Sequence, residues 1–166
     1  MLDRPQATTL LLGVGNRILS DEGVGIHVIE RLMARYEFPE EVLVLDGGTL
    51  GLDLLYYLEG VENLLLVDAV QNGGEPGNLS RLEGDDVPAF MSIKMSPHHI
   101  GIPDMLFAAK LKDIYPKNVV LLGVQPERLE VGLELSPAVE AQVETLIEQV
   151  IEQLKEWGHH PRRKTS

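Results

Sequence analysis

The chain has 166 residues, 44% of them hydrophobic, and a formal net charge of −12, which suits one globular domain with a real core and makes nucleic acids and anionic lipids poor partners. The absence of cysteine excludes disulfides, thiolate metal ligands and a cysteine nucleophile. The first ten residues lack the apolar core of a secretory signal, and no apolar run approaches the ~20 residues of a membrane helix, so we expect no membrane insertion and a cytoplasmic location.

The first half of the chain alternates short apolar runs with helical patterns. Residues 8–14 predict a buried strand that ends in glycine, and residues 22–36 predict a helix with an apolar stripe and with Ser20 or Asp21 as its cap. A second strand, a short helix and a third strand are predicted over residues 41–45, 52–58 and 63–67. The third strand is apolar without interruption, which is typical of a parallel sheet covered on both faces.

The second half is less regular before the alternation returns. Residues 79–82 predict a short strand, and residues 84–97, interrupted by Pro88 and Pro97, predict no regular element. The remaining elements are a helix, a strand and a last helix opened by a Ser-Pro pair, starting at residues 105, 119 and 136. This alternation predicts a three-layer α/β domain over residues 1–158 with a mostly parallel sheet, an antiparallel strand within residues 71–97, and a disordered basic tail over residues 159–166.

Acidic and imidazole side chains follow the predicted strands. Two acids come after the glycine turn of the first strand, one acid ends each of the next two strands, and a His-His pair lies in the irregular segment. These candidates are Asp21, Glu22, Asp46, Asp68, His98 and His99. Ligands of open α/β sheets bind at the carboxyl ends of the strands, so we expect these side chains to converge on one rim. Two carboxylates and an imidazole suit zinc, nickel, manganese or iron.

Each candidate also has a structural interpretation. Asp21 and Glu22 could cap a turn or favour the helix dipole, Asp46 could be a turn residue, and one of the two histidines could be an exposed loop residue. Asp68 is harder to explain in this way, because a buried acid needs hydrogen bonds or a charge partner. A nucleotide-binding turn is disfavoured, since Ile18 stands where the third glycine of the fingerprint belongs. There is no Gly-x-Ser-x-Gly elbow either.

Five segments, spread in order over nearly the whole chain, resemble the maturation endopeptidases of nickel–iron hydrogenases. They are GVGNRILSDEGVG (13–25), DGGTLGLDLL (46–55), LLLVDAV (64–70), MSPHHIG (95–101) and GVQPE (123–127). The resemblance implies an α/β/α sandwich with a five-stranded mixed sheet. It also implies an enzyme that removes a short C-terminal extension from the hydrogenase large-subunit precursor after nickel has been inserted, and we expect that enzyme to be a monomer.

The resemblance also implies a ligand set. Glu22, Asp68 and His98 match the family's metal-binding acids and histidine, His99 adjoins the motif, and Asp46 matches a position near the cleft. We expect the metal to be nickel carried by the substrate, while zinc or cadmium could occupy the same ligands in vitro. The expected reaction is metal-assisted attack by water, with one carboxylate, such as Asp68, as general base.

Three other functions stay open at this point. The first is a metal-insertion checkpoint that binds the precursor without cutting it. The second is a nucleotide-binding domain, and the third is a hydrolase of broad specificity with a resident metal. Residues 71–95 are a candidate substrate-facing segment, because irregular loops on rigid scaffolds often carry specificity.

Overall fold

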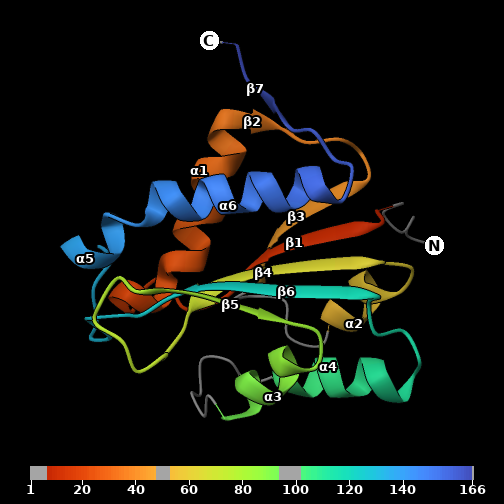
Figure 1. Cartoon of the computed structure of the whole chain (residues 1–166), viewed down its shortest axis with the longest axis horizontal. Helices are drawn as coiled ribbons and strands as arrows, with labels where there is room; N and C mark the ends of the chain where they lie inside the picture. Colours follow the sequence, from red (N-terminus) through yellow and green to blue (C-terminus); the bar gives the residue numbers. More distant parts are fainter. Residues whose placement is uncertain (1–6, 48–52, 94–101, 166) are drawn as a thin grey trace.

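The computed structural model describes residues 7–47, 53–93 and 102–165, which form a three-layer α/β/α sandwich (Figure 1). The central sheet has five strands in the order β3-β1-β4-β6-β5. These strands are β1 (Thr9–Gly13), β3 (Val42–Asp46), β4 (Asn63–Ala69), β5 (Leu79–Glu83) and β6 (Asn118–Val124). All neighbours pair in parallel except β5, which runs antiparallel to β6. The predicted fold class, with its mostly parallel mixed sheet, is confirmed.

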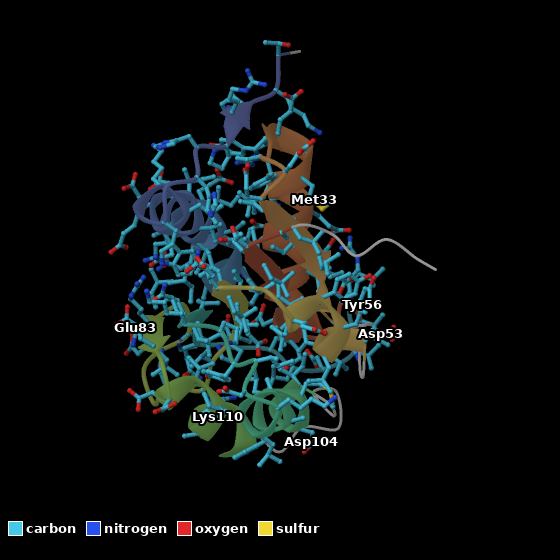
Figure 2. All side chains as sticks on the ribbon, turned by 90° about the vertical axis from the view of Figure 1, so that its right-hand side faces the viewer. Met33, Asp53, Tyr56, Glu83, Asp104 and Lys110 are labelled. Atoms are coloured by element: carbon cyan, nitrogen blue, oxygen red, sulfur yellow. The ribbon has the colours of Figure 1, made fainter. Side chains whose placement is uncertain are left out.

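Helices cover both faces of this sheet. In Figure 1, α1 and α6 lie on one side, and α2, α3 and α4 lie on the other. The helical segments are η1 (Ser20–Gly23), α1 (Val24–Arg35), α2 (Asp53–Leu58), α3 (Asp86–Ile93), α4 (Ile102–Leu111), α5 (Pro137–Glu140) and α6 (Val143–Glu156). Met33 of α1 and Lys110 of α4 mark the two outer layers in Figure 2. Within the described ranges, no helix has the length and apolar character needed to cross a bilayer.

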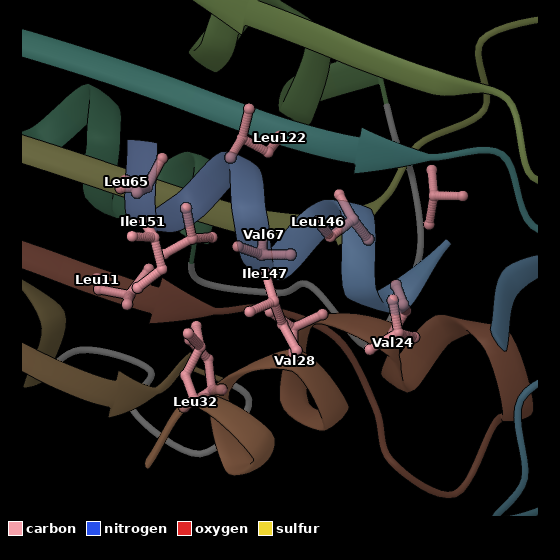
Figure 3. Close-up of a cluster of buried hydrophobic side chains, with 14 of the residues drawn as sticks. Leu11, Val24, Val28, Leu32, Leu65, Val67, Leu122, Leu146, Ile147 and Ile151 are labelled. Carbon is pink, nitrogen blue, oxygen red and sulfur yellow. The ribbon is translucent and has the colours of Figure 1, made fainter. Parts of the chain in front are cut away.

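Two apolar clusters fill the space between the layers. On the α1 and α6 side, alternate residues such as Leu11, Leu65 and Val67 pack against Val28 and Ile147 (Figure 3). On the other side, the intervening strand residues pack against α2, α3 and α4. Strand side chains alternate between faces, so this division follows from the register. Each fully buried leucine contributes about 2 kcal/mol.

Three details of the predicted elements are corrected. Helix α1 begins at Val24, after the 3₁₀ turn η1, and neither Ser20 nor Asp21 caps it through its side chain. Asp68 lies inside β4 and does not follow it. Residues expected to be irregular form α3, because Pro88 stands in its first turn, where no helical partner is needed for the missing N–H.

The last helix and the tail also differ from expectation. Ser136 caps α5 by accepting a hydrogen bond from Val139 N at 3.5 Å, but the helix stops at Glu140 and α6 begins only at Val143. The tail was predicted to be disordered, and this is wrong for the described residues 159–165. They include β7 (Arg162–Arg163), which pairs antiparallel with β2 (Tyr36–Glu37) at the end of α1.

Candidate active site

The turn after β1 is built around Gly15. Its φ is +124°, a conformation that other residues rarely adopt. A Cβ at this position would overlap the carbonyl oxygen of Glu22 and lie 3.5 Å from Oδ1 of Asp68. The backbone N–H of Asn16 donates to the same Glu22 carbonyl at 3.1 Å. Gly15 therefore leaves the space in which the backbone of Glu22 approaches the carboxylate of Asp68.

Glu22 and Asp68 are both buried carboxylates. Glu22, in η1, is 5% exposed, and Asp68, in β4, is 1% exposed. Oδ1 of Asp68 accepts a hydrogen bond from Ala69 N at 2.7 Å. Burying two acids at one end of the sheet is costly unless hydrogen bonds, a proton or a cation offset their charges. Such an arrangement favours acid–base chemistry or the binding of a cation.

A second glycine fixes η1 and α1 against the sheet. A Cβ at Gly25 would overlap the carbonyl oxygen of Val67 and lie 2.6 Å from that of Val14. Any larger residue would push α1 away from β1 and β4. This close backbone approach is what carries η1, and Glu22 with it, onto β4. The glycines of the 13–25 segment thus serve packing at the site. The Glu22 carbonyl that fills the turn has the wrong polarity for a phosphate.

Asp21 has a different role from its neighbour. It is fully buried, and its carboxylate accepts hydrogen bonds from Glu127 N and Arg128 N, each at 2.9 Å, and from Ser136 N at 2.8 Å and Ser136 Oγ at 2.7 Å. In return, Asp21 N donates to Arg128 O at 3.0 Å. Asp21 therefore anchors the loop between β6 and α5.

Asp46 lies apart from the Glu22 and Asp68 pair. It is exposed at the end of β3, in register with Gly13 of β1. Val44 packs in the cluster beside α1 and α6, whereas Leu66 of β4 belongs to the cluster on the other face. Because side chains alternate, Asp46 is on the α1 and α6 face, and Asp68 is on the opposite face. The structure therefore does not bring these two acids together.

His98 and His99 lie outside the described residues, so an imidazole ligand stays a prediction. Among the residues that the structure describes, no three histidine or carboxylate groups are placed to hold a metal ion. The chain enters this gap from α3 and leaves it into α4. Both helices lie on the face of the sheet that Asp68 occupies.

Gln125, at the end of β6, is a further rim residue, and it organises the neighbouring loop. It is buried, its Oε1 accepts from Asn72 N at 2.7 Å, and its Nε2 donates to Gln71 Oε1 at 2.8 Å. Its backbone pairs with Gly77 and Asn78. The glycine-rich segment that sequence analysis assigned to substrate contact is thus fastened to the sheet over residues 71–78.

A groove of about 820 Å³ lies away from these residues, between β5 and α6. Its floor includes Leu79 and Leu122, and its α6 rim carries Glu148, Glu152 and Glu156. Leu79 and Leu122 belong to the α1 and α6 face. The groove is therefore on the opposite face from Asp68 and is not part of the candidate site.

Comparison with known proteins identifies relatives over most of the chain. A family model described as hydrogenase maturation protease matches residues 26–153. The chain is 42% identical over 150 residues to the hydrogenase 2 maturation protease of Escherichia coli (strain K12), covering 90% of this chain and 92% of that protein. It is 43% identical over 151 residues to the hydrogenase expression/formation protein HupD of Rhodobacter capsulatus, covering 90% and 72%.

Solved structures give the same result. The hydrogenase maturating endopeptidase HybD from E. coli matches with a TM-score of 0.89 and 39% identity, covering 94% of this chain and 97% of that one. A nickel–iron hydrogenase maturation protease from Thermococcus kodakarensis matches with a TM-score of 0.69 and 26% identity, covering 88% and 97%. The chain therefore belongs to the hydrogenase maturation protease family, a family of peptide hydrolases.

Proposed function

We propose that this protein is the endopeptidase that removes the C-terminal extension of a nickel–iron hydrogenase large-subunit precursor after nickel insertion. The observation that carries the proposal is the burial of two acids, Glu22 and Asp68, at the carboxyl edge of the sheet, where Gly15 lets the backbone of Glu22 approach the Asp68 carboxylate. Family membership supports peptide hydrolysis, and the two acids give that reaction a location.

The nickel ion is part of the substrate in this proposal. Glu22 and Asp68, joined by His98, complete the coordination of nickel that the precursor brings. Carboxylate oxygens and imidazole nitrogen suit a divalent ion of borderline softness, and the chain has no cysteine that could bind it as a thiolate. A precursor without nickel would not be held with its scissile bond at the two acids. Cleavage would then report that the metal has been inserted.

The reaction is hydrolysis by water, because the chain has neither a cysteine nor a serine elbow to act as nucleophile. The oxygen of water forms a bond to the scissile carbonyl carbon, and the carbon–nitrogen bond breaks. Asp68 takes the proton from water and returns it to the leaving amine. The bound substrate's nickel supplies Lewis-acid polarisation. Burial of Glu22 and Asp68 excludes bulk water and strengthens these electrostatic effects.

The test is to incubate the nickel-loaded precursor and the nickel-free precursor with the protein and to measure the precursor mass. We expect loss of a C-terminal peptide only from the nickel-loaded form. Glu22→Gln, Asp68→Asn and His98→Ala should each slow processing by about 100-fold or more, the scale of a lost catalytic contact. Asp104→Asn, at an exposed position on α4, is the matched control (Figure 2).

Two outcomes would reject the proposal. If the wild-type protein binds the precursor and leaves its mass unchanged, the protein is a checkpoint and not a protease. If the nickel-free precursor is cut at the same rate, the substrate's nickel takes no part. Unimpaired processing by His98→Ala would remove that histidine alone from the site.

A further inference from the structure

Four large aliphatic side chains are exposed on two backbone-paired segments next to η1. Ile18 lies in the turn after β1, and three others lie in the loop between β6 and α5; together they are Ile18, Leu129, Val131 and Leu133. Gly132 N donates to Ile18 O at 2.9 Å, and Ser20 N donates to Gly132 O at 2.8 Å, so the two segments run in parallel. We call these four side chains the apolar rim. Val131 is 82% exposed and Leu133 is 62% exposed.

Hydrogen bonds to residues of η1 hold the loop that carries the apolar rim in place. Asp21 accepts four hydrogen bonds from Glu127, Arg128 and Ser136. Ser20 Oγ donates to Glu130 O at 2.8 Å, and the φ of Ser20 is +50°, a left-handed conformation that these hydrogen bonds maintain. A buried carboxylate and a strained serine thus fix the shape of an exposed loop.

Folding does not explain why this loop displays aliphatic residues. Side chains that stay in water give no burial energy, and clustered ones favour association. A surface that binds a partner protein does need exposed apolar side chains. They should already be held in place, because prior ordering lowers the entropy cost of binding. A firmly anchored loop with an apolar surface meets this requirement.

The position of the apolar rim identifies its partner. Ser20 pairs with Gly132 of the loop and lies two residues before Glu22, so the apolar rim is within reach of a polypeptide whose scissile bond lies at Glu22 and Asp68. Within the described part of the chain, the cations of these two segments are paired, Arg17 with Glu30 and Arg128 with Glu130. With a net charge of −12 on the chain, an anionic partner has little to bind here. We infer that the apolar rim docks an apolar surface of the hydrogenase large-subunit precursor next to the cleavage junction, an inference that rests on the proposed function.

The experiment compares the double variant Val131→Asp with Leu133→Asp against the wild type, using the nickel-loaded precursor. We expect KM for processing, and the dissociation constant measured separately by calorimetry, to rise about tenfold or more, as for the loss of interface anchors. The value of kcat at saturating precursor should stay within about twofold, because neither residue touches the two acids. Leu111→Asp, at a position 89% exposed on α4, should change neither constant.

The outcomes separate this inference from the proposed function. A wild-type protein that binds but does not cut rejects the protease, while the binding constants still decide the role of the apolar rim. Unchanged KM and affinity in the double variant would overturn the inference. So would a wild-type dimer in sedimentation that becomes monomeric in the double variant while its affinity for the precursor is unchanged, because the apolar rim would then join two copies of this chain. Urea unfolding checks that each variant is folded. If the double variant is not folded, the comparison is made with Val131→Asp alone.

Discussion

The strands of the central sheet bury polar side chains at both of their ends, which we call the amino edge and the carboxyl edge. The two ends differ in the hydrogen-bonding groups that are buried. At the amino edge, Asn63 Nδ2 donates to Thr9 Oγ1 at 2.9 Å, Asn118 Nδ2 donates to Asn63 Oδ1 at 2.8 Å, and Thr9 Oγ1 shares a hydrogen bond of 2.8 Å with the ring of His159. At the carboxyl edge, the buried polar residues include three acids, Asp21, Glu22 and Asp68.

This difference separates stability from function. Hydroxyl, amide and imidazole groups both donate and accept, so the amino edge satisfies itself across neighbouring strands. A carboxylate only accepts, so each acid at the carboxyl edge needs donors or a cation. Backbone N–H groups and a hydroxyl supply them for Asp21. We therefore assign Asp21 to architecture, whereas the chemical role proposed for Glu22 and Asp68 rests on their burial at this edge of the sheet.

The largest expected effect is the loss of the Asp21 anchor. Asp21→Ala leaves three backbone N–H groups and the Ser136 hydroxyl without their acceptor, so the free energy of unfolding should fall by about 3 kcal/mol or more. Asp104→Ala, at an exposed position, should cost about 0.5 kcal/mol or less. Urea titrations of both variants measure the difference, and equal losses would contradict the role given to Asp21.

Gly15→Ala should have the next largest effect. The added Cβ would overlap the Glu22 carbonyl, so the turn must open and the variant should lose about 2 kcal/mol or more of stability together with most of its processing activity. Gly73→Ala is the matched control, because Gly73 also has positive φ, at +78°, but nothing lies within 4 Å of its Cβ position. It should lose about 1 kcal/mol and keep its activity. Equal activity in the two variants would show that the turn does not shape the site.

The fold was predictable because its signals are local. Apolar runs such as residues 63–67, ended by an acid or a glycine, indicate buried parallel strands without knowledge of their partners. The same pattern placed the end of the third strand too early, because Asp68 continues the buried strand. Glu22 was singled out because it follows the turn at the carboxyl end of a predicted strand, where ligands of open α/β sheets bind.

The function of Asp21 could not be read in this way. Its hydrogen-bond partners lie 106 to 115 residues further along the chain, so no local spacing of residues predicts them. The tail was misjudged for a similar reason, because β7 pairs with β2 more than a hundred residues earlier. Helix α3 was not predicted because it contains Pro88, and a proline argues against a helix except in its first turn. Sequence patterns therefore do not predict contacts between residues that are far apart in the chain.

A smaller effect is expected at the amino edge. Thr9→Val keeps the shape of the side chain but leaves Asn63 Nδ2 and the His159 ring without their shared partner, which should cost about 1–2 kcal/mol. Precursor processing should stay within about twofold of wild type, because the change is at the end of β1 remote from Gly15. Thr9→Ser retains the hydroxyl and should recover most of the stability. A large loss of activity in folded Thr9→Val protein would contradict the assignment of stability to the amino edge and of function to the carboxyl edge.

The smallest effect concerns pH and His27 of α1, which belongs to neither edge. Burial, and then the charges of Arg17 and Arg31, lower the pKa of His27 below its usual 6.5, although Glu30 and Glu140 act in the other direction. Its Nε2 is buried and meets no hydrogen-bond partner among the described residues. The folded state therefore favours the neutral ring.

The sign of the effect follows from proton uptake. As pH falls through 6.5, the unfolded chain protonates His27 before the folded chain does, so the free energy of unfolding decreases. The pKa values of Glu140 and Glu144 are lowered by their bonds to Arg31 and Arg35, and their contribution is lost only below about pH 4.5. Between pH 7 and pH 5, His27→Gln should therefore lose less stability than wild type in urea titrations. His160→Gln, an exposed position in the tail, should keep the wild-type slope, and a steeper slope in His27→Gln would contradict the assignment.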